Sequence, residues 1–385
     1  MIASRLVPPV SDDSDEARSL LHALRAEVRA FVVAQRREGR IPPRVDSWLT
    51  GWDEEFTHAL AAMGWLGMTV PVEYGGHGRS HLERFVVIEE LLAAGAPVAA
   101  HWIADRQIVP SLLKYGSETQ KQRYLPAIVR GECFFGIGMS EPDSGSDLAS
   151  VRTRAVRVEG GWRITGTKLW TSGAHRADAM ICLARSGLLD PARRHDGLSQ
   201  FIVDLRSPGV DIRAIISMNG QHHFNEVFLE DVFVGDDMVL GTIGDGWEQV
   251  TSELGFERSG PERFLSTFPL LAETAEQMRL TAVHRHPDLG RFVARLAGLH
   301  QMSLAVSGAL ERGESADTAA AVVKVLGTTT EGDVADFADL LTGSAAAVDY
   351  RRLVAEAVTQ RPGFTLRGGT NEILRGVIAR GLGMR

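Results

Sequence analysis

Two short segments of the 385-residue chain combine side chains that could hold a planar polar ligand. Residues 139–147 read MSEPDSGSD, with hydroxyls, carboxylates, a proline and a glycine. Such a segment cannot continue a helix or a central strand, because proline lacks an N–H donor and Ser and Asp side chains compete for the backbone. Residues 169–174 read LWTSGA, and a tryptophan beside two hydroxyls suits a flat heteroaromatic ring with a polar edge. Taken alone, this tryptophan could equally be a core aromatic, and the serine cluster could be an ordinary loop.

The elements around these segments change type along the chain. Apolar residues at helical spacing predict helices over 13–37, 53–63, 85–94 and 98–115, and Ser117 with Gln120 forms a capping box that opens a helix to Ile128. Residues 66–71 are expected to be extended. An apolar run at 133–138 and alternating segments up to about residue 234 predict strands, among them 162–165, 179–183, 198–203 and 226–229. Helical periodicity returns after residues 244–246. This order predicts an α+β fold with an N-terminal helical domain (1–130), a middle β domain (131–238) and a C-terminal helical domain (239–385).

Composition narrows the class of protein. A hydrophobic content of 44%, a charged content of 23% and a net charge of −8 are ordinary for a globular protein and argue against nucleic acid or an anionic membrane as the main partner. Cys133 and Cys182 lie in apolar contexts, which predicts buried inert thiols and a reducing compartment. Residues 1–20 lack the apolar core of a signal peptide, and no apolar run is long enough for a membrane span. The expectation is a cytoplasmic protein.

Several fragments resemble, in the same order, the markers of the acyl-CoA dehydrogenase family. They are residues 71–76 (PVEYGG), 114–121 (KYGSETQK), 124–126 (YLP), 139–147, 166–172 (GTKLWTS) and 230–234 (EDVFV). The resemblance implies an N-terminal helical domain, a middle β-barrel or sandwich that binds flavin, and a C-terminal four-helix bundle. It also implies FAD as the cofactor. No GxGxxG segment opens a helix after a strand, so a Rossmann site has no support.

The resemblance assigns ligand contacts to specific residues. Residues 137–140 would run beside the isoalloxazine, and residues 170–172 would cover its other side near N5. Ser146 would contact the acyl-CoA. The residues matched to the cofactor are Ile137, Met139, Ser140, Trp170, Thr171, Ser172, Thr370 and Glu372.

The family reaction removes a proton α to a thioester and transfers a hydride from the β carbon to flavin N5, which leaves an α,β-unsaturated acyl thioester. Many members carry the catalytic carboxylate just before a Gly-Thr pair, where this chain has Gly368. A second family arrangement places a glutamate before an arginine on a helix of the C-terminal domain, which matches Glu257 and Arg258. Glu257 is therefore the candidate base. Gly368 would leave room for it and donate its N–H to the thioester oxygen.

Alternatives to this assignment stay open. Glu257 and Arg258 could form a solvated surface pair, or act at a partner subunit. Arg258 could contact the substrate or hold its helix. Glu253 and Glu262 are the nearest other carboxylates, and only Glu253 shares a helix face with Glu257.

One departure affects the cofactor and the oligomer. The Arg-x-x-Phe-Gly segment that reaches the cofactor pyrophosphate of a neighbouring subunit in the family is missing from residues 278–291. The implied partners are an acyl-CoA, an electron-transfer flavoprotein as acceptor, and further copies in a homotetramer or homodimer. The alternatives are a non-catalytic or half-site subunit of a hetero-oligomer, or a dehydrogenase or oxidase acting on acyl carrier protein or another non-CoA substrate. No metal site is expected: His222-His223 and His284/His286 read as a turn and a solvated loop, and His101 as a structural residue.

Overall fold

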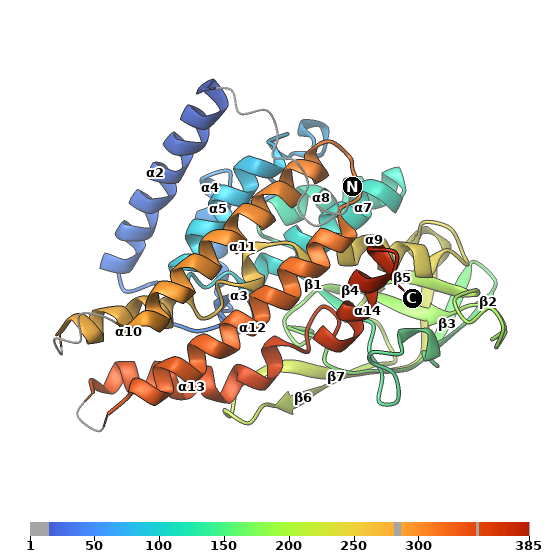
Figure 1. The fold of residues 1–385 in the computed structure, drawn as a ribbon. Helices are drawn as coiled ribbons and strands as arrows, with labels where there is room; N and C mark the ends of the chain where they lie inside the picture. The colour runs from blue at the N-terminus through green and yellow to red at the C-terminus, as the bar shows by residue number, and fades with distance from the viewer. Residues whose placement is uncertain (1–14, 281–285, 344–345, 385) are drawn as a thin grey trace. The chain divides into compact units, whose positions relative to one another are not determined.

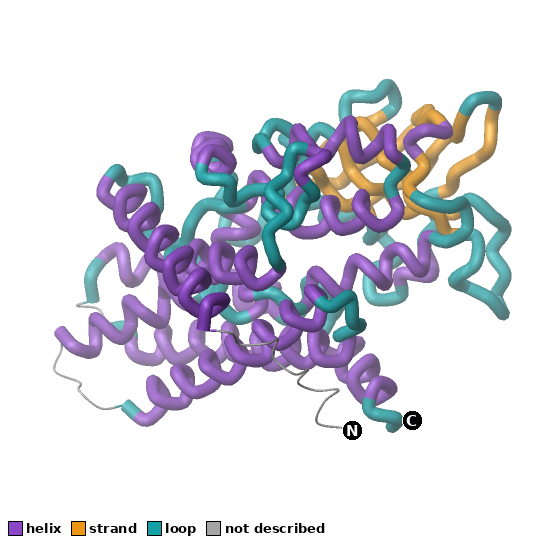
Figure 2. Tube along the Cα trace, turned by 90° about the horizontal axis from the view of Figure 1, so that it is seen from above, coloured by secondary structure: helices purple, strands orange, loops and turns teal. Residues whose placement is uncertain are grey.

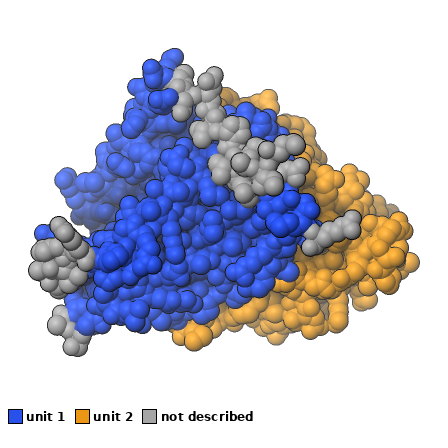
Figure 3. All heavy atoms as spheres, in the orientation of Figure 1, with its two compact units in different colours: residues 1–52, 79–98, 255–385 blue, residues 53–78, 99–254 orange. Residues whose placement is uncertain are grey.

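The structure is a computed structural model that describes residues 15–280, 286–343 and 346–384, with the backbone alone at 254–257. The chain divides into two compact units (Figure 3). Unit 1 comprises residues 1–52, 79–98 and 255–385, and unit 2 comprises residues 53–78 and 99–254. One boundary falls inside helix α9 (Gly246–Arg258), just before Gly255.

Unit 1 is helical. Its C-terminal part is a bundle in which α12 lies between α11 and α13 and also packs against α10 and α14 (Figure 1). The helix α5 packs against both α2 and α11. The helices of this unit are α2 (Asp15–Arg37), α3 (Ser47–Thr50), α5 (His81–Ala93), α10 (Phe268–Leu280), α11 (Pro287–Glu311), α12 (Asp317–Leu341), α13 (Val348–Phe364) and α14 (Asn371–Gly381), with the 3₁₀ turn η5 (Pro261–Arg263).

Small residues let the bundle pack closely. Ala335 and Ala338 of α12 are fully buried with the aromatic ring of Phe364 in one apolar cluster. At Gly327 a Cβ atom would come within 2.2 Å of the Arg263 carbonyl oxygen, so the turn η5 passes directly over the backbone of α12. Any larger residue at this position would force the two elements apart.

Unit 2 carries all the strands of the described residues (Figure 2). The sheet has the order β6-β7-β3-β2-β4-β5-β8, and β1 pairs parallel with β4 off this path. The strands are β1 (Phe135–Gly138), β2 (Arg154–Val158), β3 (Gly161–Lys168), β4 (Ala179–Arg185), β5 (Leu198–Asp204), β6 (Val210–Ile216), β7 (His222–Gly235) and β8 (Val239–Leu240). The helices are α4 (Glu54–Ala62), α6 (Ala99–Ile103), the π-helix η2 (Ala104–Ile108), α7 (Val109–Tyr115), α8 (Glu118–Val129) and most of α9.

Most predicted elements are confirmed. The helix expected over 98–115 forms as α6, η2 and α7 in succession, and the side chains of Ser117 and Gln120 make the predicted capping box of α8. The prediction of an extended segment at 66–71 is wrong. This segment is a series of turns, because Gly67 takes a positive φ of 59° and its carbonyl accepts a hydrogen bond from Val70 N at 3.0 Å. A Cβ at Gly67 would also come within 2.3 Å of the Val129 side chain.

Candidate functional site

The two candidate ligand-binding segments lie side by side in unit 2. Residues 139–147 follow β1, and residues 169–174 follow β3. The backbone N–H of Leu169 donates to the carbonyl oxygen of Ser140 at 2.8 Å, which joins the two segments. Since β1 and β3 are not paired with each other in the sheet, this bond is made where both strands have ended.

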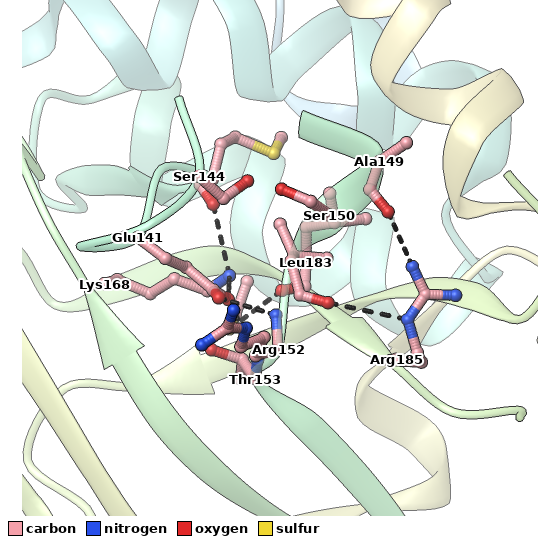
Figure 4. Close-up of polar contacts among 12 residues, drawn as sticks. Glu141, Ser144, Ala149, Ser150, Arg152, Thr153, Lys168, Leu183 and Arg185 are labelled. Carbon is pink, nitrogen blue, oxygen red and sulfur yellow. Dashed lines mark hydrogen bonds and ion pairs between the residues drawn. The ribbon is translucent and has the colours of Figure 1, made fainter. Parts of the chain in front are cut away.

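A buried ion pair fixes the same junction (Figure 4). Lys168 is fully buried, and its Nζ donates to Glu141 Oε1 at 2.7 Å and to the Met139 carbonyl at 3.2 Å. The Glu141 carboxylate also accepts from the backbone N–H groups of Arg152 at 2.6 Å and Thr153 at 3.0 Å. Burial raises the pKa of Glu141, but the charge of Lys168 and the hydrogen bonds from Lys168, Thr153 and Arg152 outweigh it, so this pKa is lowered. The carboxylate is therefore ionised, and Lys168 reaches back to the first segment.

The rest of the first segment is a tight turn that ends at an exposed serine. Glu141 N donates to Ser144 O at 2.7 Å and Ser144 N donates to Glu141 O at 3.1 Å. The Ser144 hydroxyl then donates to the carbonyl of Asp147 at 2.9 Å. Ser146 lies on the outside of this turn and is solvent-exposed, so it is open to a ligand.

Trp170 is not a core aromatic. Its indole is 55% exposed, and its backbone has a left-handed φ of 61°. A non-glycine residue in this region is uncommon and costs roughly 1–2 kcal/mol. The edge of the ring packs on Phe224 at a centroid distance of 5.5 Å. The backbone therefore holds a large flat side chain at the surface, as a ligand platform requires.

Thr171 supplies the polar part of the same platform. The residue is fully buried, and its Oγ1 has no hydrogen-bond partner among the described residues. A buried hydroxyl without a partner is costly, and a bound polar edge would remove that cost. Ser172 beside it and Ile137, Met139 and Ser140 opposite are all half-buried. An exposed indole, an unsatisfied hydroxyl and half-buried groups on the adjoining segment fit a flavin ring.

The other predicted residues belong to unit 1 and surround one loop, residues 365–370. Gly368 and Gly369 have left-handed φ values of 66° and 87°. The guanidinium of Arg258 donates from Nε to the Gly368 carbonyl oxygen at 3.0 Å. The last turn of α9, which includes the backbone of Glu257, therefore lies against the loop at Gly368. The Glu257 side chain lies outside the described residues.

The loop then turns into α14. Thr370 is the N-cap of this helix, where its hydroxyl accepts from Ile373 N at 3.3 Å, and Glu372 occupies the first turn. Lys324 is fully buried on α12, and its Nζ donates to Thr365 O at 2.8 Å and to Asn371 Oδ1 at 2.9 Å. A buried ammonium thus holds both ends of the loop.

A second cation, the half-buried Arg367, fixes the middle of the loop. Arg367 pairs with Asp46 at 2.5 Å, and its guanidinium lies 4.7 Å from the centre of the Trp48 ring. Glu331 is buried nearby, where it accepts from Ser266 N at 2.8 Å. Burial raises the pKa of Glu331 to about 7, although Arg367 acts in the opposite direction.

The sequence did not reveal these anchoring residues. Lys168 lies within a quoted fragment, but its partner is 27 residues away. The bond between Arg367 and Asp46 joins positions 321 residues apart. The available signal in the sequence was a single lysine within an apolar run, as at Lys324.

The remaining candidates are engaged in structural contacts. Glu253 is buried and accepts from Gln200 Nε2 at 3.0 Å, and Glu262 is also buried. His101 is buried, with its Nδ1 3.0 Å from the Thr57 hydroxyl. His222 belongs to β7 and not to a turn, which corrects that expectation. His284 lies outside the described residues.

Among the described residues, no cluster of three histidine, cysteine or carboxylate side chains could hold a metal. No described helix has the length and apolarity that crossing a bilayer requires.

Comparisons with known proteins decide the family. Family models described as the acyl-CoA dehydrogenase N-terminal, middle and C-terminal domains match residues 20–132, 136–232 and 280–383. Acyl-CoA dehydrogenase FadE29 of Mycobacterium tuberculosis is 35% identical over 331 residues, which cover 82% of this chain and 84% of that protein. The chain belongs to the acyl-CoA dehydrogenase family. Members of this family depend on FAD, and the fold is theirs, with helical N- and C-terminal domains and a β-sheet domain between them in the sequence.

Other relatives add detail. Acyl-CoA dehydrogenase FadE34 of Mycobacterium tuberculosis is 34% identical over 341 residues, or 86% of this chain, but the chain spans only 46% of that relative's length. Among solved structures, the "Tcur3481-Tcur3483 steroid ACAD" superimposes with a TM-score of 0.82 at 30% identity, over 97% of this chain and 99% of that one. The ChsE4-ChsE5 complex from Mycobacterium tuberculosis gives a TM-score of 0.79 at 27% identity, over 97% and 99%.

Proposed function

We propose that the protein is an FAD-dependent acyl-CoA dehydrogenase that forms an α,β-unsaturated acyl thioester. The observation that carries this proposal is the exposed, left-handed Trp170 beside the buried Thr171 hydroxyl that has no partner among the described residues. A flavin ring can pack on an exposed aromatic face, and its polar edge can accept a hydrogen bond from the hydroxyl of Thr171. Family membership supports the same conclusion.

The proposed roles follow the family pattern onto this chain. When bound, FAD supplies the hydride acceptor. Glu257 removes the α-proton, and the Gly368 N–H donates to the thioester oxygen as negative charge develops there. Arg258 donates to the Gly368 carbonyl. We also assign substrate contact to Arg258 and contact with the acyl-CoA to Ser146.

The proposed cofactor contacts are those that the family pattern assigns. They are Ile137, Met139, Ser140, Trp170, Thr171, Ser172, Thr370 and Glu372. We further propose domain boundaries at 1–130, 131–238 and 239–385. We also propose that an electron-transfer flavoprotein accepts the electrons from the reduced flavin. The protein would act in the cytoplasm as a homodimer or homotetramer.

Anaerobic bleaching of the bound flavin tests the proposal. Purified protein is mixed with a panel of straight, branched and steroid-type acyl-CoAs, because one similar structure is titled a steroid enzyme. Glu257→Gln should lower the bleaching rate by about a hundredfold or more without loss of FAD, since a positioned base contributes about 10² to 10⁴. Glu248→Gln, an exposed carboxylate in the first turn of the same helix, is the matched control and should bleach normally. Equal rates for Glu257→Gln and wild type would refute the base assignment, and a protein that stays colourless with added FAD would refute the function.

A second candidate is a subunit of a hetero-oligomer. Residues 278–291 lack the family's Arg-x-x-Phe-Gly segment, and two of the similar structures are titled as pairs of chains. In the described part of this region, Arg279 bonds to Glu276 and Arg291 pairs with Asp288, so both arginines already have acidic neighbours. This candidate predicts an inactive protein alone that gains flavin and activity with a second chain. If acyl carrier protein thioesters bleach the flavin and acyl-CoAs do not, the substrate class changes instead.

A further inference from the structure

The first residues of β7 are hydrogen-bonded to the segment that carries Trp170. Asn225 is fully buried and exchanges two backbone hydrogen bonds with Thr171, at 3.0 and 3.1 Å. The Asn225 side chain adds a third bond, from Nδ2 to the Thr171 carbonyl at 2.9 Å. Beside it, Gly173 N donates to His223 O at 2.9 Å, and Phe224 packs on the Trp170 ring. One end of a strand therefore fixes both the backbone and the exposed ring.

Two histidines orient the Asn225 amide. The Oδ1 atom lies 3.1 Å from His175 Nδ1 and 2.8 Å from His222 Nε2. The two imidazole rings stack with centroids 3.9 Å apart and an angle of 21° between their planes. With each ring donating one N–H to Oδ1, the Nδ2 group is directed toward Thr171, so all polar atoms of the amide are used.

We propose that Asn225 is a positioning residue for residues 170–172 and that the stacked pair His175 and His222 makes this positioning sensitive to pH. The His175 ring donates to Asn225 Oδ1 while it is uncharged. In acid it would gain a positive charge in its stack with His222 and beside Arg176 and His223, so the stack would open, which frees the amide to rotate and loosens the Thr171 carbonyl. This inference rests on the proposed flavin site and names a residue that acts on that site through Thr171.

The electrostatic surroundings agree with this direction. Burial lowers the pKa of His175, and His222, Arg176 and His223 lower it further, while the hydrogen bond with Asn225 raises it. The net shift is downward, so the folded segment favours neutral His175. As the pH falls below the ordinary histidine pKa near 6.5, protonation of His175 therefore opposes the stacked, hydrogen-bonded arrangement of His175, His222 and Asn225.

The first measurement is FAD affinity of the apoprotein, from quenching of flavin fluorescence at pH 7.5 and 5.5. For wild type the dissociation constant should rise roughly tenfold at pH 5.5, the equivalent of one pKa unit between bound and free forms. Asn225→Ala should weaken binding roughly tenfold at pH 7.5, because one bond to Thr171 and the acceptor of two rings are lost. His222→Phe keeps a stacked ring without a charge and should remove most of the pH dependence.

Asn225→Asp separates positioning from simple loss of stability. A carboxylate cannot donate to the Thr171 carbonyl, yet it attracts the His175 ring when that ring is charged. Its affinity for FAD should be weaker than that of wild type at pH 7.5 and should improve as the pH falls, opposite to wild type. Asn219→Ala, in the turn where Asn219 Oδ1 accepts from Gln221 N at 3.1 Å, is the matched control and should behave as wild type.

The second measurement needs no cofactor. Imidazole NMR titration of the apoprotein should give a His175 pKa below that of a free histidine, raised in His222→Phe and lowered further in Asn225→Ala. An unchanged His175 pKa in both variants, or an FAD affinity that ignores pH in wild type, would overturn the inference. If no variant binds FAD at any pH, the proposed function fails, and the titration still decides whether the histidine pair acts as described.

Discussion

Replacing Lys168 by methionine should show how strongly the junction of residues 139–147 and 169–174 depends on its buried ion pair. Methionine keeps the length of the side chain and removes its charge. Glu141 would then be a buried carboxylate with backbone N–H groups but no counter-ion. Breaking one partner of a buried pair costs about 3–5 kcal/mol, a large share of the roughly 5–15 kcal/mol that keeps a typical domain folded.

Chemical denaturation followed by tryptophan fluorescence measures this loss, with the double variant Lys168→Met/Glu141→Gln closing a double-mutant cycle. A neutral glutamine removes the stranded charge, so the double variant should recover at least about 1 kcal/mol relative to the single one. Lys114→Met is the control, because Lys114 is exposed and donates to one hydroxyl at 2.9 Å. A loss below about 1 kcal/mol for Lys168→Met, or a double variant no more stable than the single one, would refute this view of the junction.

The pH dependence of the same pair has a definite sign. The pKa of Glu141 is lower in the folded protein than in the unfolded chain. The pair's contribution is therefore complete above the ordinary glutamate value near 4.3 and disappears as the pH falls through the lowered one. Stability measured between pH 6 and pH 3 should fall more steeply for wild type than for the double variant.

Three further predictions concern the other unit and the thiols. Arg258→Lys should slow substrate-dependent bleaching by roughly tenfold with unchanged FAD content, since it removes the Nε donor to the Gly368 carbonyl; a normal rate would count against this role. Burial raises the pKa of Glu331 to about 7, so its contribution to the free energy of unfolding is complete below the unfolded value and is lost as the pH rises to about 7. The free energy of unfolding of wild type should therefore fall by roughly 3 kcal/mol from pH 5 to 8, and Glu331→Gln should flatten this fall. A pH dependence parallel to that of wild type would contradict the prediction. Burial raises the pKa of Cys133 to about 12 and that of Cys182 to about 11, so neither thiol should react with iodoacetamide at pH 8 in native protein, whereas both should react after unfolding; labelling of the native protein, read by mass spectrometry, would disprove this.

Local signals in the sequence proved reliable where the physics is local. The capping box of Ser117 and Gln120 depends on residues three apart, and the structure confirms it. The ion pair of Lys168 and Glu141 depends instead on two strands ending together, and the contact of Asn225 with the second segment depends on β7 reaching back to it. Neither pattern leaves a periodic signal, so no reading of spacing alone could have found them.

The two candidate ligand-binding segments were recognisable because their residue types are unusual. No rule applied to the sequence predicted their positions in space. Trp170 illustrates the limit. Its composition allowed both a core aromatic and a ligand platform, and only its exposed ring and left-handed backbone distinguish them. The segment at 66–71 failed for a related reason, since close approach of Val129 to Gly67 is a property of the fold and not of the segment.

The bond between Arg367 and Asp46 affects how the protein folds during its synthesis on the ribosome. Unit 1 is assembled from three separate stretches of chain, with Asp46 in the first of them and its partner Arg367 in the third. Closing so long a loop is slow, and its ends cannot meet until residue 367 has been synthesised. The early helices must therefore wait with their apolar faces uncovered, while the contiguous run from residue 99 to 254 can already form. Chaperone demand during expression should fall on the N-terminal helices, and a fragment ending before residue 365 should be recovered mainly as aggregate.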